Sequence, residues 1–140
     1  AVVSGAPQET EEAFATYGHE LGMAFQLIDD VLDYSATAAE WGKTLGNDLA
    51  EGKPTLPVIH ALAHADADGQ DAIRRGLEGE GADLLEPVRA AIDATGALDY
   101  TTRAAEARIQ RAQQALAELP DTPERRALAD VADFVVRRDF

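Results

Sequence analysis

Apolar residues recur at spacings of three and four along most of the chain, which is the spacing of one face of an α-helix. The longest such stripe lies between about Glu9 and Tyr34 and consists of Leu21, Phe25, Ile28 and Leu32. We therefore predict one long helix over this stretch. The segment Ser4-Gly5-Ala6-Pro7 before it is typical of a turn between two helices.

Further helices are predicted after a break. They cover about Thr55–His64, Gln70–Leu77, Leu84–Ile92, Leu98–Leu119, and a last segment after Pro123 that carries Leu128, Val131, Val135 and Val136. Thr55 suits an N-cap, Pro57 suits a first turn, and Gly96 suits a C-cap. We expect turns at 66–69 and 78–81, and an irregular loop from Ser35 to Lys53, where the helical pattern is absent. Long irregular loops in compact domains are usually functional.

The composition agrees with an all-α fold. Alanine, the best helix former, accounts for 28 of 140 residues, whereas aromatic residues make up only 6%. This length fits one domain or part of one. The absence of cysteine excludes disulfide scaffolds, thiolate zinc sites and cysteine nucleophiles.

The net charge of −14 excludes whole classes of partner. Such an acidic chain does not bind nucleic acid non-specifically or dock on an anionic membrane. No apolar run approaches the roughly 20 residues of a membrane helix, so we expect no stable membrane insertion. No signal peptide is recognisable, and we expect a cytoplasmic protein. Because the chain opens on the apolar run Ala1-Val2-Val3, we also expect its N-terminus to be a cut.

Three aspartates share one face of the first long helix. At 100° per residue, Asp29, Asp30, Asp33 and Gln26 fall opposite the apolar stripe. Clustered carboxylates repel one another unless a cation lies between them, and their oxygens suit Mg²⁺. The alternative is a solvated acidic face, but the strongly apolar sequence on both sides of the aspartates favours a site.

The loop that follows carries the opposite charge. Lys43 follows Gly42 and Lys53 follows Gly52. Glycine lets the backbone approach a phosphate closely, and the ammonium group supplies positive charge. The spacing is not that of a P-loop. With the aspartates, these lysines indicate a combined diphosphate and metal site.

Other clusters favour ordinary roles. His60 and His64 are four residues apart, as in a metal site, but no carboxylate motif accompanies them. The acids between Asp66 and Asp71 fail the calcium-loop pattern. We therefore predict no second metal site.

Two blocks together carry a specific resemblance. The blocks Gly18–Tyr34, with Phe-Gln-x-x-Asp-Asp-x-x-Asp, and Gly42–Pro57, with Gly-Lys-x-x-Gly-x-Asp-Leu, resemble the second aspartate-rich region of the trans-isoprenyl diphosphate synthases, or polyprenyl synthetases. Downstream segments, among them Leu84–Val88 and Leu119–Pro123, resemble the long-chain bacterial members, above all those with octaprenyl products. The resemblance covers all 140 residues.

The resemblance implies a helical bundle around a central cavity and a prenyltransferase activity. Such enzymes join isopentenyl diphosphate head-to-tail to an allylic prenyl diphosphate, which ionises with the help of Mg²⁺. By match to the motif, Asp29 and Asp33 would contact the metal and Asp30 would support them. Lys43 and Lys53 would hold the diphosphate, Asp48 would orient the loop, and Phe25 and Gln26 would border the prenyl group. The family also implies a homodimer.

One departure limits what this chain does alone. The family has two aspartate-rich motifs, and this sequence contains only the second. We therefore expect residues 1–140 to be the C-terminal half of a synthase domain and to be inactive alone. A non-catalytic subunit of a heteromeric synthase and an unrelated helical binding module are the alternatives.

Overall fold

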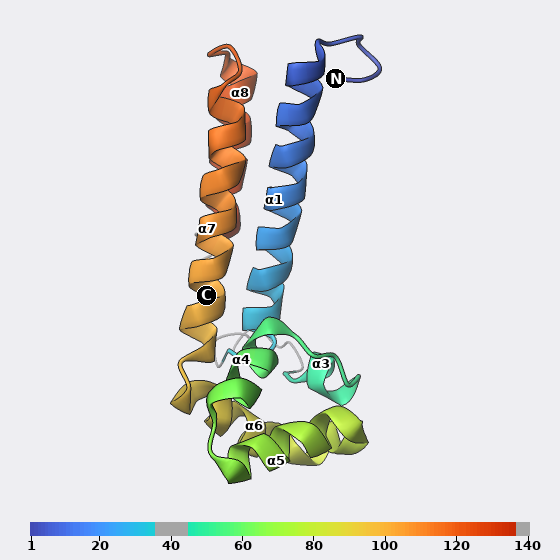
Figure 1. The fold of residues 1–140 in the computed structure, drawn as a ribbon, viewed down its shortest axis with the longest axis vertical. Helices are drawn as coiled ribbons and strands as arrows, with labels where there is room; N and C mark the ends of the chain where they lie inside the picture. Colours follow the sequence, from blue (N-terminus) through green and yellow to red (C-terminus); the bar gives the residue numbers. More distant parts are fainter. Residues whose placement is uncertain (36–44, 137–140) are drawn as a thin grey trace. The chain divides into compact units, whose positions relative to one another are not determined.

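The computed structural model describes residues 1–35 and 45–136, and the ordered elements in those ranges are all helical. This confirms the all-α prediction. In chain order they are α1 (Gln8–Leu32), α3 (Asn47–Ala50), α4 (Leu56–His64), α5 (Ala67–Arg75), η1 (Gly76–Glu80), α6 (Gly81–Ala94), α7 (Ala97–Ala117) and α8 (Pro123–Val136). The segment η1 is a kink rather than a regular helix, because Gly79 has a non-helical φ of 120°, within the predicted turn at 78–81. Figure 1 labels the α-helices.

Two helix boundaries and one additional helix differ from the prediction, each for a local reason. Helix α1 ends at Leu32, so Asp33 lies in the turn that follows. Helix α5 begins at Ala67 because the Asp66 carboxylate caps it and accepts a hydrogen bond from the Gly69 amide at 2.9 Å. The loop predicted as irregular contains α3, whose four residues are too few to show a helical period.

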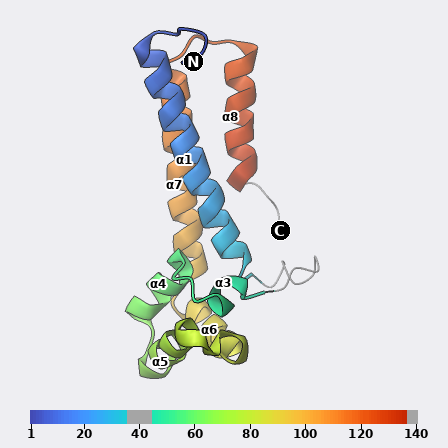
Figure 2. The ribbon, with the colours of Figure 1, turned by 90° about the vertical axis from the view of Figure 1, so that its right-hand side faces the viewer.

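The described chain divides into two compact units, and the first contains residues 1–28 and 104–136. Its parts of α1, α7 and α8 run alongside one another, with α7 antiparallel to the other two (Figures 1 and 2). The partly buried Glu20 on α1 accepts hydrogen bonds from Arg108 (3.2 Å) and Arg111 (3.1 Å) on α7. The Tyr17 hydroxyl donates to the Leu128 carbonyl at 2.9 Å.

The predicted apolar stripe of α1 is only partly buried. Ile28 and Leu32 are almost completely buried, but Phe25 is 39% exposed. Phe25 and Leu21 instead line a groove of about 410 Å³ with two α1 glycines and with α8 residues; the other lining residues are Gly18, Gly22, Val131, Phe134 and Val135. The buried line of this helix passes through Tyr17 and the small Ala24. The prediction was wrong at Phe25, because it assumed that the large apolar side chains are the buried ones. Where helices pack closely, a small residue such as Ala24 can take the buried position.

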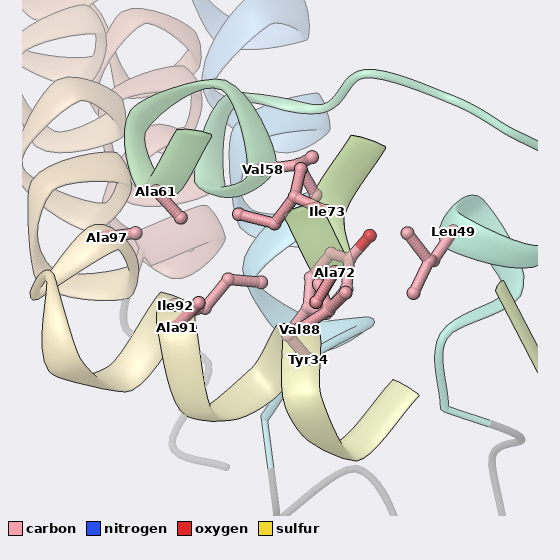
Figure 3. Packing of buried hydrophobic residues seen from close by; sticks show 10 residues of the cluster. All are labelled: Tyr34, Leu49, Val58, Ala61, Ala72, Ile73, Val88, Ala91, Ile92 and Ala97. Atoms are coloured by element: carbon pink, nitrogen blue, oxygen red, sulfur yellow. The ribbon is translucent and has the colours of Figure 1, made fainter. Parts of the chain in front are cut away.

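The second unit contains residues 29–103 and has its own core. Figure 3 shows that side chains from the turn after α1 and from α3, α4, α5, α6 and the start of α7 meet there. The core consists of Tyr34, Leu49, Val58, Ala61, Ala72, Ile73, Val88, Ala91, Ile92 and Ala97. Tyr34 and Leu49 are the core members next to the aspartates and the loop, so the core fixes both chain segments of the candidate site.

No helix in the described part of the chain is long and apolar enough to span a membrane.

Candidate metal and diphosphate site

The three predicted aspartates lie at the end of α1, in the second unit, together with Asp48 and Lys53. Each of Asp29, Asp30 and Asp33 is of intermediate exposure. They therefore do not form a fully solvated face.

Asp33 binds the start of α3. Its carboxylate accepts hydrogen bonds from the Asn47 amide at 3.2 Å and the Asp48 amide at 2.9 Å, and its carbonyl accepts one from the Gly46 amide at 3.0 Å. The first amides of a helix have no intrahelical acceptor, so a carboxylate is a suitable partner for them. Gly46 has φ 73°, a left-handed conformation that favours glycine and turns the chain into this contact.

The Asp30 carboxylate lies near the start of α4, where the Leu56 amide lowers its pKa. Thr55 occupies the N-cap position as predicted, with Pro57 in the first turn, but the Thr55 side chain makes no capping hydrogen bond.

Lys53 lies between these two contacts. Its ammonium group pairs with the Asp48 carboxylate at 3.1 Å and the Glu51 carboxylate at 2.7 Å, and its amide donates to the Asp48 carbonyl at 2.8 Å. Asp48 thus contacts both Asp33 and Lys53, the arrangement expected of a residue that orients the loop. Glu51 is a partner of Lys53 that the motif match did not single out, although its opposite charge two residues away was a signal.

The aspartates disfavour one another's charge. The pKa of Asp30 is raised to about 6 by partial burial first, and then by the nearby Asp48, Asp29 and Asp33 carboxylates. Burial also raises the pKa of Asp33, against the stabilising amides of Asp48 and Asn47. This crowding is what a bound cation would relieve.

We predict that Asp30 destabilises the fold as pH rises. Its folded pKa of about 6 lies above the ordinary 3.8, so its stabilising contribution is complete below about 3.8 and is lost as pH rises through 6. Because the group is half exposed, we expect roughly 1–2 kcal/mol rather than the ~3 kcal/mol of the full shift. Asp30→Asn, which keeps an acceptor for the Leu56 amide, should therefore be more stable than wild type at pH 7 and not at pH 4. Urea unfolding of both proteins at pH 4 and pH 7 measures this. A difference in unfolding free energy between the two proteins that is the same at both pH values would contradict the prediction.

The donor set fits a hard cation as part of a coordination shell. Within residues 1–35 and 45–136, no three acidic or histidine side chains converge closely enough to hold a metal by themselves. Mg²⁺ is typically bound by one or two carboxylates, with waters and substrate phosphates completing its shell. The aspartates beside Lys53 match that kind of incomplete protein site.

The remaining predicted residues lie elsewhere. Phe25 lines the apolar groove of the first unit, and Gln26 on the same helix is exposed. Lys43 lies outside the described residues. The ring of His60 stacks on those of His64 and Tyr100, each at a centroid distance of 4.2 Å. This is a packing arrangement, as the sequence favoured.

A family model described as polyprenyl synthetase matches residues 1–94 of the chain. The chain belongs to the polyprenyl synthetase family. This confirms the resemblance that was based on the blocks Gly18–Tyr34 and Gly42–Pro57.

Individual members of the family are similar to this chain over nearly its whole length. It is 47% identical to octaprenyl diphosphate synthase from Escherichia coli (strain K12), over 99% of this chain and 43% of that enzyme. It is 34% identical to heptaprenyl diphosphate synthase component 2 from Bacillus subtilis (strain 168), over 100% of this chain and 40% of that protein. A polyprenyl synthase from Caulobacter crescentus CB15, crystallised with calcium and isoprenyl diphosphate, superposes with a TM-score of 0.86 at 38% identity, over 100% of this chain and 43% of that one. The chain thus spans less than half the length of these relatives.

Proposed function

We propose that this chain forms part of a Mg²⁺-dependent trans-polyprenyl diphosphate synthase that works in the cytoplasm. The reaction joins isopentenyl diphosphate to an allylic prenyl diphosphate. The bond between the allylic carbon and its diphosphate breaks, a carbon–carbon bond forms, and a proton is lost. The observation that supports the proposal is that Asp33, the last aspartate of the motif, holds the Asp48 amide while the Asp48 carboxylate pairs with Lys53, in a family whose members carry this activity in their names.

The residues have distinct roles in this proposal. Asp29 and Asp33 would hold Mg²⁺, with Asp30 in support, and the metal would neutralise the charge that develops on the departing diphosphate. Lys53 would bind the same diphosphate, together with Lys43. Asp48 would aim Lys53 at it through the 3.1 Å ion pair.

The prenyl group would lie against Phe25 and Gln26. Phe25 lines the apolar groove of the first unit, and an apolar wall excludes water from a carbocation. The product length is not part of the proposal, because the relatives named above make different products.

The matching relatives are more than twice as long as this chain, so we propose that it acts as the C-terminal part of a longer homodimeric synthase. The test is incorporation of labelled isopentenyl diphosphate into polyprenyl product, by residues 1–140 alone and by the longer protein. We expect activity only in the longer protein. Absence of Mg²⁺-dependent incorporation in both would contradict the proposal.

A second candidate is the subunit of a heteromeric synthase. The relative named as component 2 of a heptaprenyl diphosphate synthase favours it. In that case activity appears only after a separate partner chain is added, and not when the chain is extended at its N-terminus.

A further inference from the structure

The segment that carries Lys53 is attached at one end to the turn after α1. The Asp33 carboxylate accepts the Asn47 and Asp48 amides at the start of α3, and its carbonyl accepts the Gly46 amide at 3.0 Å. At the other end of the segment, the Leu56 amide lies near the Asp30 carboxylate on α1 and lowers its pKa. Two aspartates three residues apart therefore face the two ends of a segment of ten residues.

Within the segment the backbone is bonded almost continuously. The Glu51 amide donates to the Asn47 carbonyl at 3.0 Å, the Gly52 amide to the Leu49 carbonyl at 3.0 Å, and the Lys53 amide to the Asp48 carbonyl at 2.8 Å. The position of Lys53 therefore follows from where Asp48 is held, and Asp48 is held by Asp33.

The two helix starts of the segment lack capping side chains of their own. Helix α3 has four residues, far below the length at which a helix is stable in isolation, and its N-cap Gly46 has no side chain to accept the first amides. Helix α4 begins without a hydrogen bond from its N-cap side chain. Neither helix start is therefore capped by the side chain of its own N-cap residue.

We infer that Asp30 and Asp33 are positioning residues that clamp the Lys53 segment to α1 and so hold a diphosphate-binding lysine in place before substrate arrives. A carboxylate has about four acceptor sites, so the clamp is compatible with metal coordination by the same groups. The clamp itself does not depend on the proposed function, but its benefit for diphosphate binding does. Fixing Lys53 in advance reduces the ordering cost of binding.

Amide hydrogen exchange of the 140-residue chain, measured by NMR in metal-free buffer with chelator, tests the clamp. In Asp33→Ala we expect the Asn47, Asp48 and Lys53 amides to exchange at least about tenfold faster, and the Leu56 amide to be unchanged. In Asp30→Ala we expect the converse. Without metal, aspartates that serve only as metal ligands would affect none of these amides, and that result would overturn the inference.

Two further variants separate the clamp from loss of folding. Asp66→Ala removes a comparable cap from α5, and we expect it to speed exchange at Gly69 and not in the Lys53 segment. Asp30→Asn removes the charge but keeps an acceptor, so it should restore the protection of Leu56 that Asp30→Ala loses. If Asp33→Ala does not fold, Asp33→Asn replaces it and should release one of the two α3 amides; equal acceleration of all amides in the chain would overturn the inference.

The proposed function is tested apart from this. If wild type fails to bind Mg²⁺ and inorganic diphosphate while the amides respond as expected, the proposed function is wrong and the clamp is supported.

Discussion

Asp29→Ala in the longer synthase is expected to lower kcat for condensation by about 10²–10³-fold, the usual cost of removing one group that stabilises transition-state charge. Asp29 is the first aspartate of the motif and lies at the end of α1 with intermediate exposure. Under the proposed function, its loss would remove one oxygen ligand from a site in which the protein supplies only part of the metal's coordination shell, so few other ligands would compensate.

The fold should tolerate this change. Asp29 is not a member of the buried core cluster. Steady-state rates over a range of Mg²⁺ concentrations, with circular dichroism as a check on folding, measure the effect. Asp93→Ala, an exposed aspartate on α6 of the same unit, is the matched control and should keep wild-type rates. Equal rates in the two variants would remove Asp29 from the site.

Gly81→Ala is expected to destabilise the second unit by about 2–3 kcal/mol through overpacking. A Cβ at Gly81 would lie 2.6 Å from the Leu49 carbonyl oxygen and 3.0 Å from the Ala50 Cα, both backbone atoms of α3. Backbone cannot move aside as a flexible side chain does. Relief would require α3 to separate from the start of α6 and would withdraw Leu49 from the core.

The control is Gly22→Ala on α1, where an added Cβ meets nothing within 4 Å. Alanine there should be neutral or should stabilise by up to about 1 kcal/mol, because it favours helix. Urea unfolding of the three proteins measures both effects. A Gly81→Ala midpoint equal to that of Gly22→Ala would show that the close approach of α3 to α6 is absent in solution.

Much of the fold follows from local pattern. The helices from α4 to α8 were predicted because apolar periodicity, proline and glycine mark them, and Gly96 adopts the positive φ of 63° that a helix end requires. The short α3 could not be found this way. It exists because Asp33, fourteen residues from Asn47 in sequence, accepts its first amides.

The candidate site, too, could be predicted only in part. The residue types and their spacing singled out Asp29, Asp30, Asp33, Asp48 and Lys53 as candidates, and all five lie in one unit. Their individual contacts could not be predicted, because backbone amides carry no sequence signal. The sequence thus predicted the N-cap position of Thr55, but not that the Asp33 carboxylate accepts the first amides of α3.

The most direct test of a diphosphate and metal site in this chain is calorimetric titration of inorganic diphosphate into residues 1–140, with and without Mg²⁺. The account predicts binding that requires Mg²⁺ and that is weakened by Asp29→Ala and by Lys53→Ala, but not by Asp93→Ala. Absence of binding in the presence of Mg²⁺, or binding of equal strength without it, would contradict the account.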